Sequence, residues 1–263
     1  MGVQKLLDRL WDDFNLRLCP SSQVIHELLK QDKTLINDHI ALRTFSCSPI
    51  DLEVLARPFI ELGYQVGGDY VFKAKKLVAK HYQHPDPLMP KVFISQLQLD
   101  LCSAELQTIV AKLTAQIEIG KLKGSAFLHG GRLWDLSFAD YQTLAKESEY
   151  ASWVAAHGFG ANHFTVSVNQ LAQFTEVGEV NCFLKKHSFV INESGGEVKG
   201  TPQVLLEQSS TMADKVTVQF SEGKQQIAGG FYEFAKRYED CNGELYQGFV
   251  EASANKIFES TNG

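Results

Sequence analysis

The chain has 263 residues, of which 44% are hydrophobic and 21% charged, as in globular proteins with one large domain or two packed halves. A formal net charge of −6 argues against nucleic acid or an anionic membrane surface as the main partner, and no apolar run of about 18 residues predicts a transmembrane helix. Five scattered cysteines without a CxxC pair favour a reduced, cytoplasmic protein.

Two helices are expected at the start of the chain, within residues 1–34. Apolar residues recur at helical spacing from Val3 to Leu18 with acids between them, which indicates an amphipathic helix and not a signal peptide. A second helix is predicted from about Ser22 to Gln31, with Ser21 or Ser22 as its N-cap.

Residues 35–100 have the pattern of one β-α-β-β-β unit. A strand begins at Asn37, and the helix after it is expected to have Ser48 as N-cap, Pro49 in its first position and Gly63 as its stop. The pair Gly67-Gly68 follows. Three further strands are then predicted, around 70–72, at 75–83 and at 91–99.

Residues 101–158 are predicted to be a helical insert and not a linker. A helix over 103–118 would be capped by Ser103, and a second helical stretch runs from about 139 to 157 and ends at His157-Gly158. Apolar periodicity continues through both stretches.

The opening pattern recurs in residues 159–263. A strand at 161–169 begins with Asn-His, and a helix over about 171–187 and the pair Gly195-Gly196 follow it. Further strands are predicted at 204–210, 215–220 and 227–238. From His39 to Gly68 is 29 residues, and from His163 to Gly196 is 33. We therefore expect an α+β fold in which two βαβββ units form a curved, half-barrel mixed sheet within a single compact domain, 1–263.

The repeat also singles out candidate metal ligands. His39 and His163 occupy equivalent places in the two units and could face each other across the cavity, while Glu233 lies in an otherwise apolar strand. A buried carboxylate is costly unless it is paired or bound to a metal. Two histidines and one carboxylate are typical of non-haem Fe(II) sites. The alternatives are structural histidines and an ion pair of Glu233 with Lys236 or Arg237.

Other polar residues are weaker candidates. Arg43 lies four residues after His39 on the same strand face, about 14 Å away at most, and could hold a substrate carboxylate or form a plain salt bridge. Gln208, Ser209 and Ser210 either line a polar pocket wall or form a turn. The remaining histidines are less favoured as ligands, with His81 and His84 the strongest competitors; they are His26, His81, His84, His129, His157 and His187.

Five segments carry a resemblance over nearly the whole chain: NDHIALRTF, KKLVAKHYQHPDPLMPKVFISQL, ANHFTV, LLEQSSTMAD and GGFYEFAKRY. They resemble the 2-oxoadipate dioxygenase/decarboxylase, or hydroxyglutarate synthase, family. The resemblance implies a fold like the vicinal oxygen chelate superfamily, and Fe(II) or another divalent metal held by His39, His163 and Glu233. It also implies that Arg43 contacts the substrate. The implied reaction converts 2-oxoadipate and O2 to 2-hydroxyglutarate and CO2 in lysine breakdown.

Two other functions stay open on the same scaffold. One is a metal-dependent isomerase, lyase or hydrolase that uses Zn(II), Mn(II) or Ni(II) as a Lewis acid, and the other is a non-catalytic binding module. The sequence has no GxSxG motif and no strand-GxGxxG-helix context, which argues against an α/β-hydrolase and against a dinucleotide site.

Overall fold

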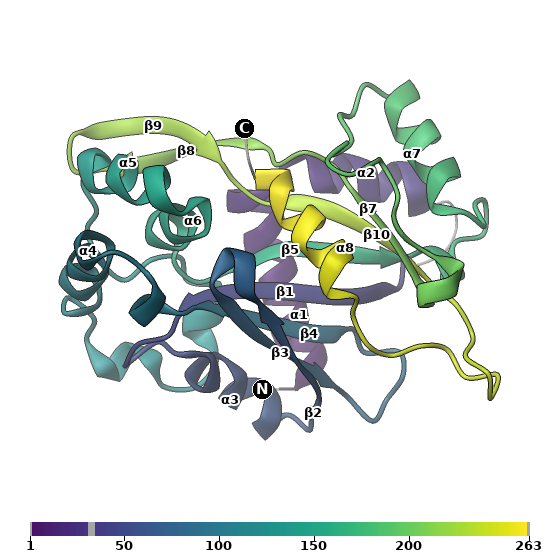
Figure 1. The fold of residues 1–263 in the computed structure, drawn as a ribbon, viewed down its shortest axis with the longest axis horizontal. Helices are drawn as coiled ribbons and strands as arrows, with labels where there is room; N and C mark the ends of the chain where they lie inside the picture. Colours follow the sequence, from purple (N-terminus) through teal and green to yellow (C-terminus); the bar gives the residue numbers. More distant parts are fainter. Residues whose placement is uncertain (1, 31–34, 262–263) are drawn as a thin grey trace.

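The computed structural model describes residues 2–30 and 35–261, and its centre is an eight-stranded mixed sheet with the order β2-β3-β4-β1-β5-β10-β7-β6 (Figure 1). Strand β1 runs parallel to β4 and β10 runs parallel to β5, while all other neighbours are antiparallel. The strands of this sheet are β1 (Asn37–Phe45), β2 (Gln65–Phe72), β3 (Leu77–Gln83), β4 (Lys91–Leu97), β5 (Ala161–Ser167), β6 (Lys199–Thr201), β7 (Leu206–Ser210) and β10 (Phe231–Arg237).

The sheet consists of two four-stranded halves with the same connectivity. One half is β1-α3-β2-β3-β4 and the other is β5-α7-β6-β7-β10, and their first strands lie side by side at the centre. Helix α3 (Leu52–Glu61) contacts β4, and helix α7 (Val177–Lys186) contacts β7 and β10. The predicted α+β fold of two βαβββ units in one curved mixed sheet is therefore confirmed.

The second half contains an insertion that the sequence pattern did not predict. The expected strand at 215–220 is β8 (Lys215–Phe220), but it pairs only with β9 (Gly223–Ala228) in a separate two-stranded sheet. The expected strand at 227–238 is accordingly two strands, because the chain breaks at Gly229-Gly230. A Cβ on Gly229 would lie 2.2 Å from the carbonyl oxygen of Leu18, so only glycine fits this close approach.

Two predicted features of the first half are wrong in detail. Helix α3 begins at Leu52 with Asp51 as its N-cap, since the Asp51 carboxylate accepts a hydrogen bond from the Val54 N–H at 3.0 Å. Ser48 and Pro49 lie in the preceding turn and are joined by a cis peptide bond. Gly63 does follow the helix, with a φ of 102° that favours glycine.

The two glycine pairs that supported the repeat do not occupy equivalent places. Gly67 and Gly68 lie inside β2, whereas Gly195 and Gly196 lie in a turn before β6, where both have positive φ. The strand predicted at 70–72 starts earlier, at Gln65. The two halves share the same connectivity, but the glycine pairs are not evidence for it.

The helices mostly follow their predicted places with shifted ends. Helix α2 (Ser21–Lys30) begins one residue earlier than predicted, so Ser21 and Ser22, the two predicted N-caps, both lie in its first turn, and Gln31 lies outside the described residues. Helix α4 (Ala104–Thr114) has Ser103 as its N-cap, as predicted. The stretch 139–157 is two helices, α5 (Phe138–Glu147) and α6 (Glu149–His157), because Ser148 interrupts it and caps α6. Helix α7 starts at Val177, six residues later than expected.

The sheet has two differently covered faces. Behind it in Figure 1 lies α1 (Val3–Asp13), which continues into the π-helical turn η1 (Phe14–Leu18). Trp11 and Phe14 pack there against Phe164 and Tyr232. Among the described helices, none is both long and apolar enough to cross a membrane.

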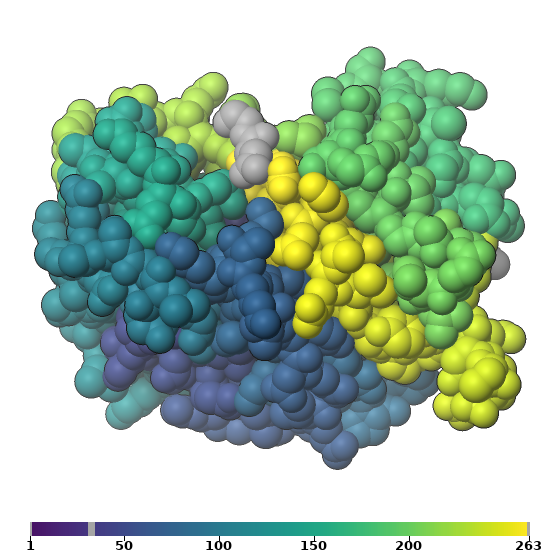
Figure 2. Space-filling model, in the orientation of Figure 1, coloured from purple at the N-terminus to yellow at the C-terminus, as the bar shows by residue number. Residues whose placement is uncertain are grey.

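The opposite, concave face is covered by the end of the chain. Helix α8 (Glu251–Ile257) and the 3-10 turn η8 (Phe258–Thr261) cross in front of the sheet. Helix α8 contacts both edge strands, β2 and β6, as well as β7. In Figure 2 this C-terminal segment, in yellow, lies between the two halves of the molecule. The interior of the half-barrel is therefore closed on its open side by residues that follow β10.

Candidate metal centre

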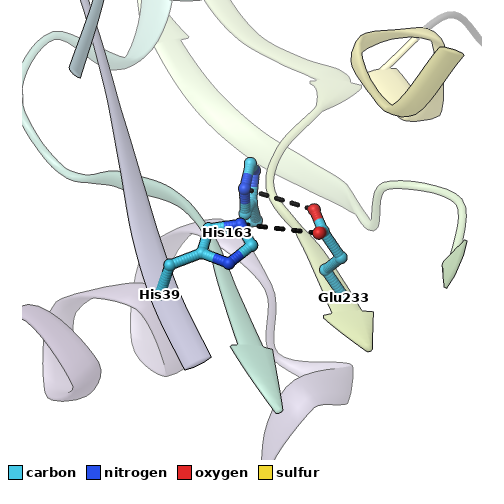
Figure 3. A group of neighbouring side chains, drawn as sticks. All are labelled: His39, His163 and Glu233. Carbon is cyan, nitrogen blue, oxygen red and sulfur yellow. Dashed lines mark ion pairs between the residues drawn. The ribbon is translucent and has the colours of Figure 1, made fainter. Parts of the chain in front are cut away.

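Three neighbouring strands bring His39, His163 and Glu233 together on the concave face. His39 lies on β1 opposite Thr165 of β5, and Glu233 on β10 is paired with the same Thr165. His163 lies two residues before Thr165, so strand alternation places all three side chains on one face. Figure 3 shows the two imidazoles and the carboxylate pointing toward one another.

The distances within this cluster suit a single metal ion. His39 Nε2 lies 3.5 Å from Glu233 Oε1, and His163 Nε2 lies 3.3 Å from Glu233 Oε2. One nitrogen or oxygen atom from each residue lies within 4.8 Å of the others, the only such convergence of three candidate ligands within residues 2–30 and 35–261. The side chains are buried, with 3%, 5% and 0% exposure. Glu233 Oε2 accepts no hydrogen bond, so a cation would satisfy it.

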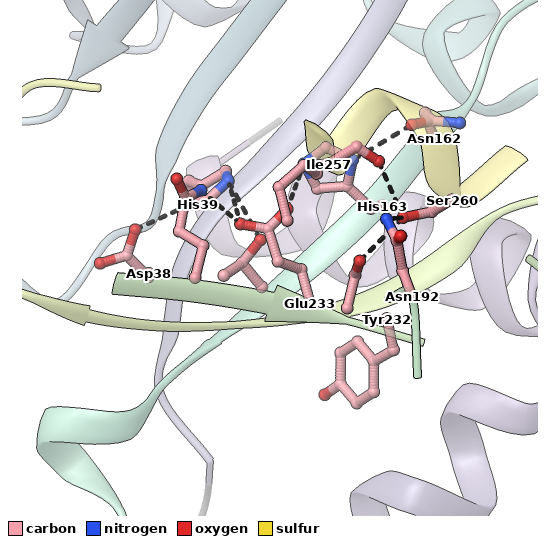
Figure 4. Close-up of polar contacts among 12 residues, drawn as sticks. Asp38, His39, Asn162, His163, Asn192, Tyr232, Glu233, Ile257 and Ser260 are labelled. Atoms are coloured by element: carbon pink, nitrogen blue, oxygen red, sulfur yellow. Dashed lines mark hydrogen bonds and ion pairs between the residues drawn. The ribbon is translucent and has the colours of Figure 1, made fainter. Parts of the chain in front are cut away.

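Neighbouring polar groups orient the three candidate ligands. His39 Nδ1 lies 2.7 Å from Asp38 Oδ1, and His163 Nδ1 lies 3.1 Å from Asn162 Oδ1, contacts visible in Figure 4. Both oxygens accept, so each imidazole holds its proton on Nδ1 and presents the Nε2 lone pair. Gln208 Nε2 donates to Glu233 Oε1 at 2.7 Å.

Burial shifts the pKa values of the cluster toward the neutral forms. It raises the pKa of Glu233 to about 8 and lowers the pKa values of His39 and His163, the latter well below its ordinary value. The positive charge of Arg43 lowers the pKa of His163 further, as does His39 when it is protonated. Without a metal the centre is therefore uncharged at neutral pH, and a divalent cation would draw the proton off the carboxyl group.

Metal affinity is expected to increase with pH up to about pH 8 for this reason. Below the raised pKa of Glu233 each cation must displace one proton, so affinity should fall by about tenfold per pH unit. Titration of Zn(II) into metal-free protein, in buffers that differ in ionisation enthalpy, measures the protons released. About one proton is expected at pH 7 and fewer above pH 8. A constant affinity from pH 6 to pH 8 would contradict a protonated Glu233.

Arg43 lies further along β1 and is almost fully buried. Its Nη1 donates to Glu149 Oε1 at 3.1 Å and its Nη2 lies 3.4 Å from the hydroxyl of Thr261 in η8. Its guanidinium lies about 5.1 Å from the ring centroids of both Tyr150 and Trp153. Because its Nε has no hydrogen-bond partner, the guanidinium keeps a free donor inside the protein.

Gln208, Ser209 and Ser210 lie in strand β7 and do not form a turn. Gln208 contacts Glu233, and Ser210, paired with Glu233 in the sheet, shares a hydrogen bond with the Ser260 hydroxyl. Ser209 points to the opposite face and donates to Asn181 of α7, so it does not line the centre. Because side chains alternate along a strand, Gln208 and Ser210 face the centre and Ser209 does not.

The competing histidines are placed elsewhere. His81 Nδ1 lies 2.9 Å from the Tyr70 hydroxyl and its Nε2 lies 2.8 Å from Gln83. His84 accepts a hydrogen bond from the Asp86 N–H in an exposed turn. Neither belongs to the cluster of three.

Sequence reasoning missed the residues that support the cluster. Asp38 and Asn162 each stand immediately before a candidate ligand histidine, a shared signal that was visible as the repeated polar-His pair. Residues 248–260 also resemble the family and could close the cavity, but the sequence assigned no contact to Phe249, whose ring contacts His39 edge-on at 4.8 Å between centroids. Ile257 and Ser260 of the C-terminal segment lie beside the cluster in Figure 4. The centre is thus enclosed by residues distant in sequence.

The fold and this cluster define a protein with paired βαβββ units around one buried candidate metal site. A family model described as 2-oxoadipate dioxygenase/decarboxylase matches residues 3–124 and 125–243. The chain belongs to this family.

Individual relatives agree with this assignment. The chain is 32% identical to the chloroplastic 2-oxoadipate dioxygenase/decarboxylase of Arabidopsis thaliana, over 92% of this chain and 73% of that protein. The crystal structure of hydroxyglutarate synthase from Oryza sativa in complex with 2-oxoadipate has a TM-score of 0.90 and 29% identity, covering 98% of this chain and 91% of that one.

Two further solved structures are similar. A Shewanella frigidimarina protein named as a hydrolase has a TM-score of 0.92 and 52% identity, covering 95% of this chain and 98% of that one. A Ralstonia eutropha protein of the glyoxalase superfamily has a TM-score of 0.76 and 21% identity, covering 93% of this chain and 84% of that one, and it shows the shared fold alone.

Proposed function

We propose that this protein is an Fe(II)-dependent dioxygenase/decarboxylase that converts 2-oxoadipate and O2 to 2-hydroxyglutarate and CO2. The observation that carries the proposal is the buried cluster of two imidazoles and one carboxylate with an unsatisfied oxygen. Family membership and the 2-oxoadipate complex of the rice relative support the substrate.

His39, His163 and Glu233 would hold the metal, which leaves other coordination positions open. Bound Fe(II) would supply the redox chemistry and polarise the 2-oxo acid. Gln208 keeps the Glu233 carboxylate oriented. Each histidine keeps its proton on Nδ1, where it is donated to Asp38 from His39 and to Asn162 from His163.

Other residues would bind the rest of the substrate and exclude water. Arg43, with its free Nε donor, would bind the carboxylate remote from the metal and so fix the orientation of a dicarboxylic 2-oxo acid. The rings of Phe231 and Phe249 contact the two histidines and keep bulk water from them. The five free cysteines support a reducing compartment such as the cytoplasm.

Anaerobic reconstitution tests this activity. Metal-free protein loaded with Fe(II) under argon and given 2-oxoadipate should consume O2 and release CO2 in equal amounts when air is admitted, with 2-hydroxyglutarate as the organic product. Protein loaded with Zn(II) is the matched control and should consume no O2. Absence of O2 uptake from Fe(II)-loaded protein would contradict the proposal.

A metal-dependent hydrolase is the second candidate, and the name of the Shewanella relative favours it. It requires the same three ligands but neither O2 nor a redox-active metal. Turnover under argon by the Zn(II)-loaded protein would distinguish it from the dioxygenase.

A further inference from the structure

Arg237 at the end of β10 connects two parts of the protein that meet at the metal centre. Its Nε and Nη2 donate to the two carboxylate oxygens of Asp38, at 2.6 and 2.9 Å. Its Nη1 donates to the carbonyl oxygens of Tyr246 and Gly248, at 2.9 and 2.8 Å. The side chains of Arg237 and Asp38 are both 4% exposed, so this is a buried, bidentate ion pair.

The Asp38 end of this pair reaches a candidate metal ligand. Asp38 Oδ1 accepts from both His39 Nδ1 and Arg237 Nη2. Arg237 donates to both carboxylate oxygens of Asp38, so the carboxylate is fixed in position beside His39. The orientation of the His39 ring therefore depends on a carboxylate that Arg237 holds in place.

The other end of Arg237 reaches the residues that cover the centre. We call residues 245–249 the covering segment. Its last residue, Phe249, packs its ring against His39 and under the Arg237 guanidinium, 5.2 Å from the ring centroid. The Phe249 N–H donates to the Tyr70 hydroxyl at 3.1 Å, which attaches the segment to the opposite half of the sheet.

Asp38 and Arg237 also line a cavity, on the side of the ion pair that faces away from His39. This cavity of about 520 Å³ is lined by Asp38 and Arg237, by Leu245 and Gln247 of the covering segment, and by Lys91 of β4. The Asp38-Arg237 pair and the covering segment thus stand between the cavity and His39.

We propose that Arg237 is a positioning residue that fixes the ligand His39 and the covering segment at the same time, so that metal binding and closure of the segment are coupled. Release of the carbonyl oxygens of Tyr246 and Gly248 from Arg237 would open the centre toward the cavity. A metal on His39 would favour the aligned Asp38 and Arg237, and hence the closed segment, and the coupling is reciprocal.

Arg17 provides a matched control. It also binds one carboxylate through two nitrogens, at Asp13, and donates to two backbone carbonyls, those of His157 and Phe159. This arrangement lies on the α1 side of the sheet and touches none of the three candidate ligands. A lysine at either position keeps the charge but cannot make all four contacts.

The test compares wild type, Arg237→Lys and Arg17→Lys by two readouts that need no turnover. Co(II) affinity is measured from its visible absorption, and the rate of chymotrypsin cleavage in the covering segment, where Leu245 is 40% exposed, is measured by mass spectrometry. We expect Arg237→Lys to bind Co(II) about 10- to 100-fold more weakly and to be cleaved faster, and Arg17→Lys to match wild type in both. Co(II) should also slow the cleavage of wild type.

Unchanged Co(II) affinity in Arg237→Lys, or equal cleavage of wild type with and without Co(II), would overturn the proposal. If Arg237→Lys does not fold, the variant Phe249→Leu tests the coupling instead, because it leaves the buried ion pair of Arg237 and Asp38 intact. This variant should lose Co(II) to EDTA at least about tenfold faster than wild type, and an unchanged rate would refute the coupling. Neither readout involves O2 or a 2-oxo acid, so its failure is distinct from failure of the proposed reaction.

Discussion

Glu233→Gln should abolish metal-dependent turnover and at the same time make the metal-free protein more stable. The amide keeps the shape of the side chain but cannot neutralise a cation, so activity should fall by more than the roughly 100-fold expected for loss of an outer hydrogen-bond partner. Stability should rise because a buried carboxylate with an unsatisfied oxygen is removed.

The gain in stability has a defined pH dependence. The pKa of Glu233 is raised from 4.5 in the unfolded chain to about 8 in the folded one. The free-energy cost of holding an ionised Glu233 in the folded protein is therefore absent below about pH 4.5. It grows as pH rises and reaches its full value above about pH 8. Thermal unfolding of the metal-free proteins should give Glu233→Gln a free energy of unfolding about 1–3 kcal/mol larger than that of wild type at pH 8.5. This difference should vanish near pH 4.5.

Glu207→Gln is the control for this comparison. Glu207 is in the next strand and is only partly buried, and it accepts a hydrogen bond from the Tyr238 hydroxyl at 2.7 Å. The control should keep its metal and show no such gain at high pH. A Glu233→Gln protein that binds metal with wild-type affinity would show that the ion is held elsewhere.

The connectivity and the three converging side chains could be predicted because both depend on local patterns. Polar-His pairs at the start of two similar units placed His39 and His163, and the aromatic neighbours of Glu233 marked it as buried. Once two βαβββ units pack with their first strands adjacent, strand alternation alone directs these residues to one face.

What could not be predicted depends on contacts between distant segments. The covering segment has no periodic pattern, and its place over His39 is set by the side chain of Arg237 and by Tyr70, which is 179 residues away from Phe249 in the sequence. The β8-β9 hairpin has ordinary strand patterning, so nothing local shows that it pairs outside the main sheet. The cap of α3 was missed because both Ser48 and Asp51 are good N-caps.

Arg43→Met should remove the preference for a dicarboxylic 2-oxo acid while leaving metal affinity close to wild type. If the guanidinium binds the remote carboxylate, its loss leaves a buried substrate charge unpaired, a cost of about 2–5 kcal/mol. The value of kcat/KM for 2-oxoadipate should fall by roughly 30-fold or more. The value for 2-oxohexanoate, which has the same chain length and no second carboxylate, should change little.

The two substrates make this a double-mutant cycle between Arg43 and the remote carboxylate. Glu149→Gln is the control, since it removes the carboxylate that now pairs with Arg43 and keeps the guanidinium. Because the Glu149 carboxylate competes with the substrate carboxylate for the charge of the same guanidinium, this variant should bind 2-oxoadipate at least as well as wild type. Equal losses for both substrates in Arg43→Met would instead mean that Arg43 only packs against Tyr150 and Trp153, and that the second carboxylate is recognised by other residues.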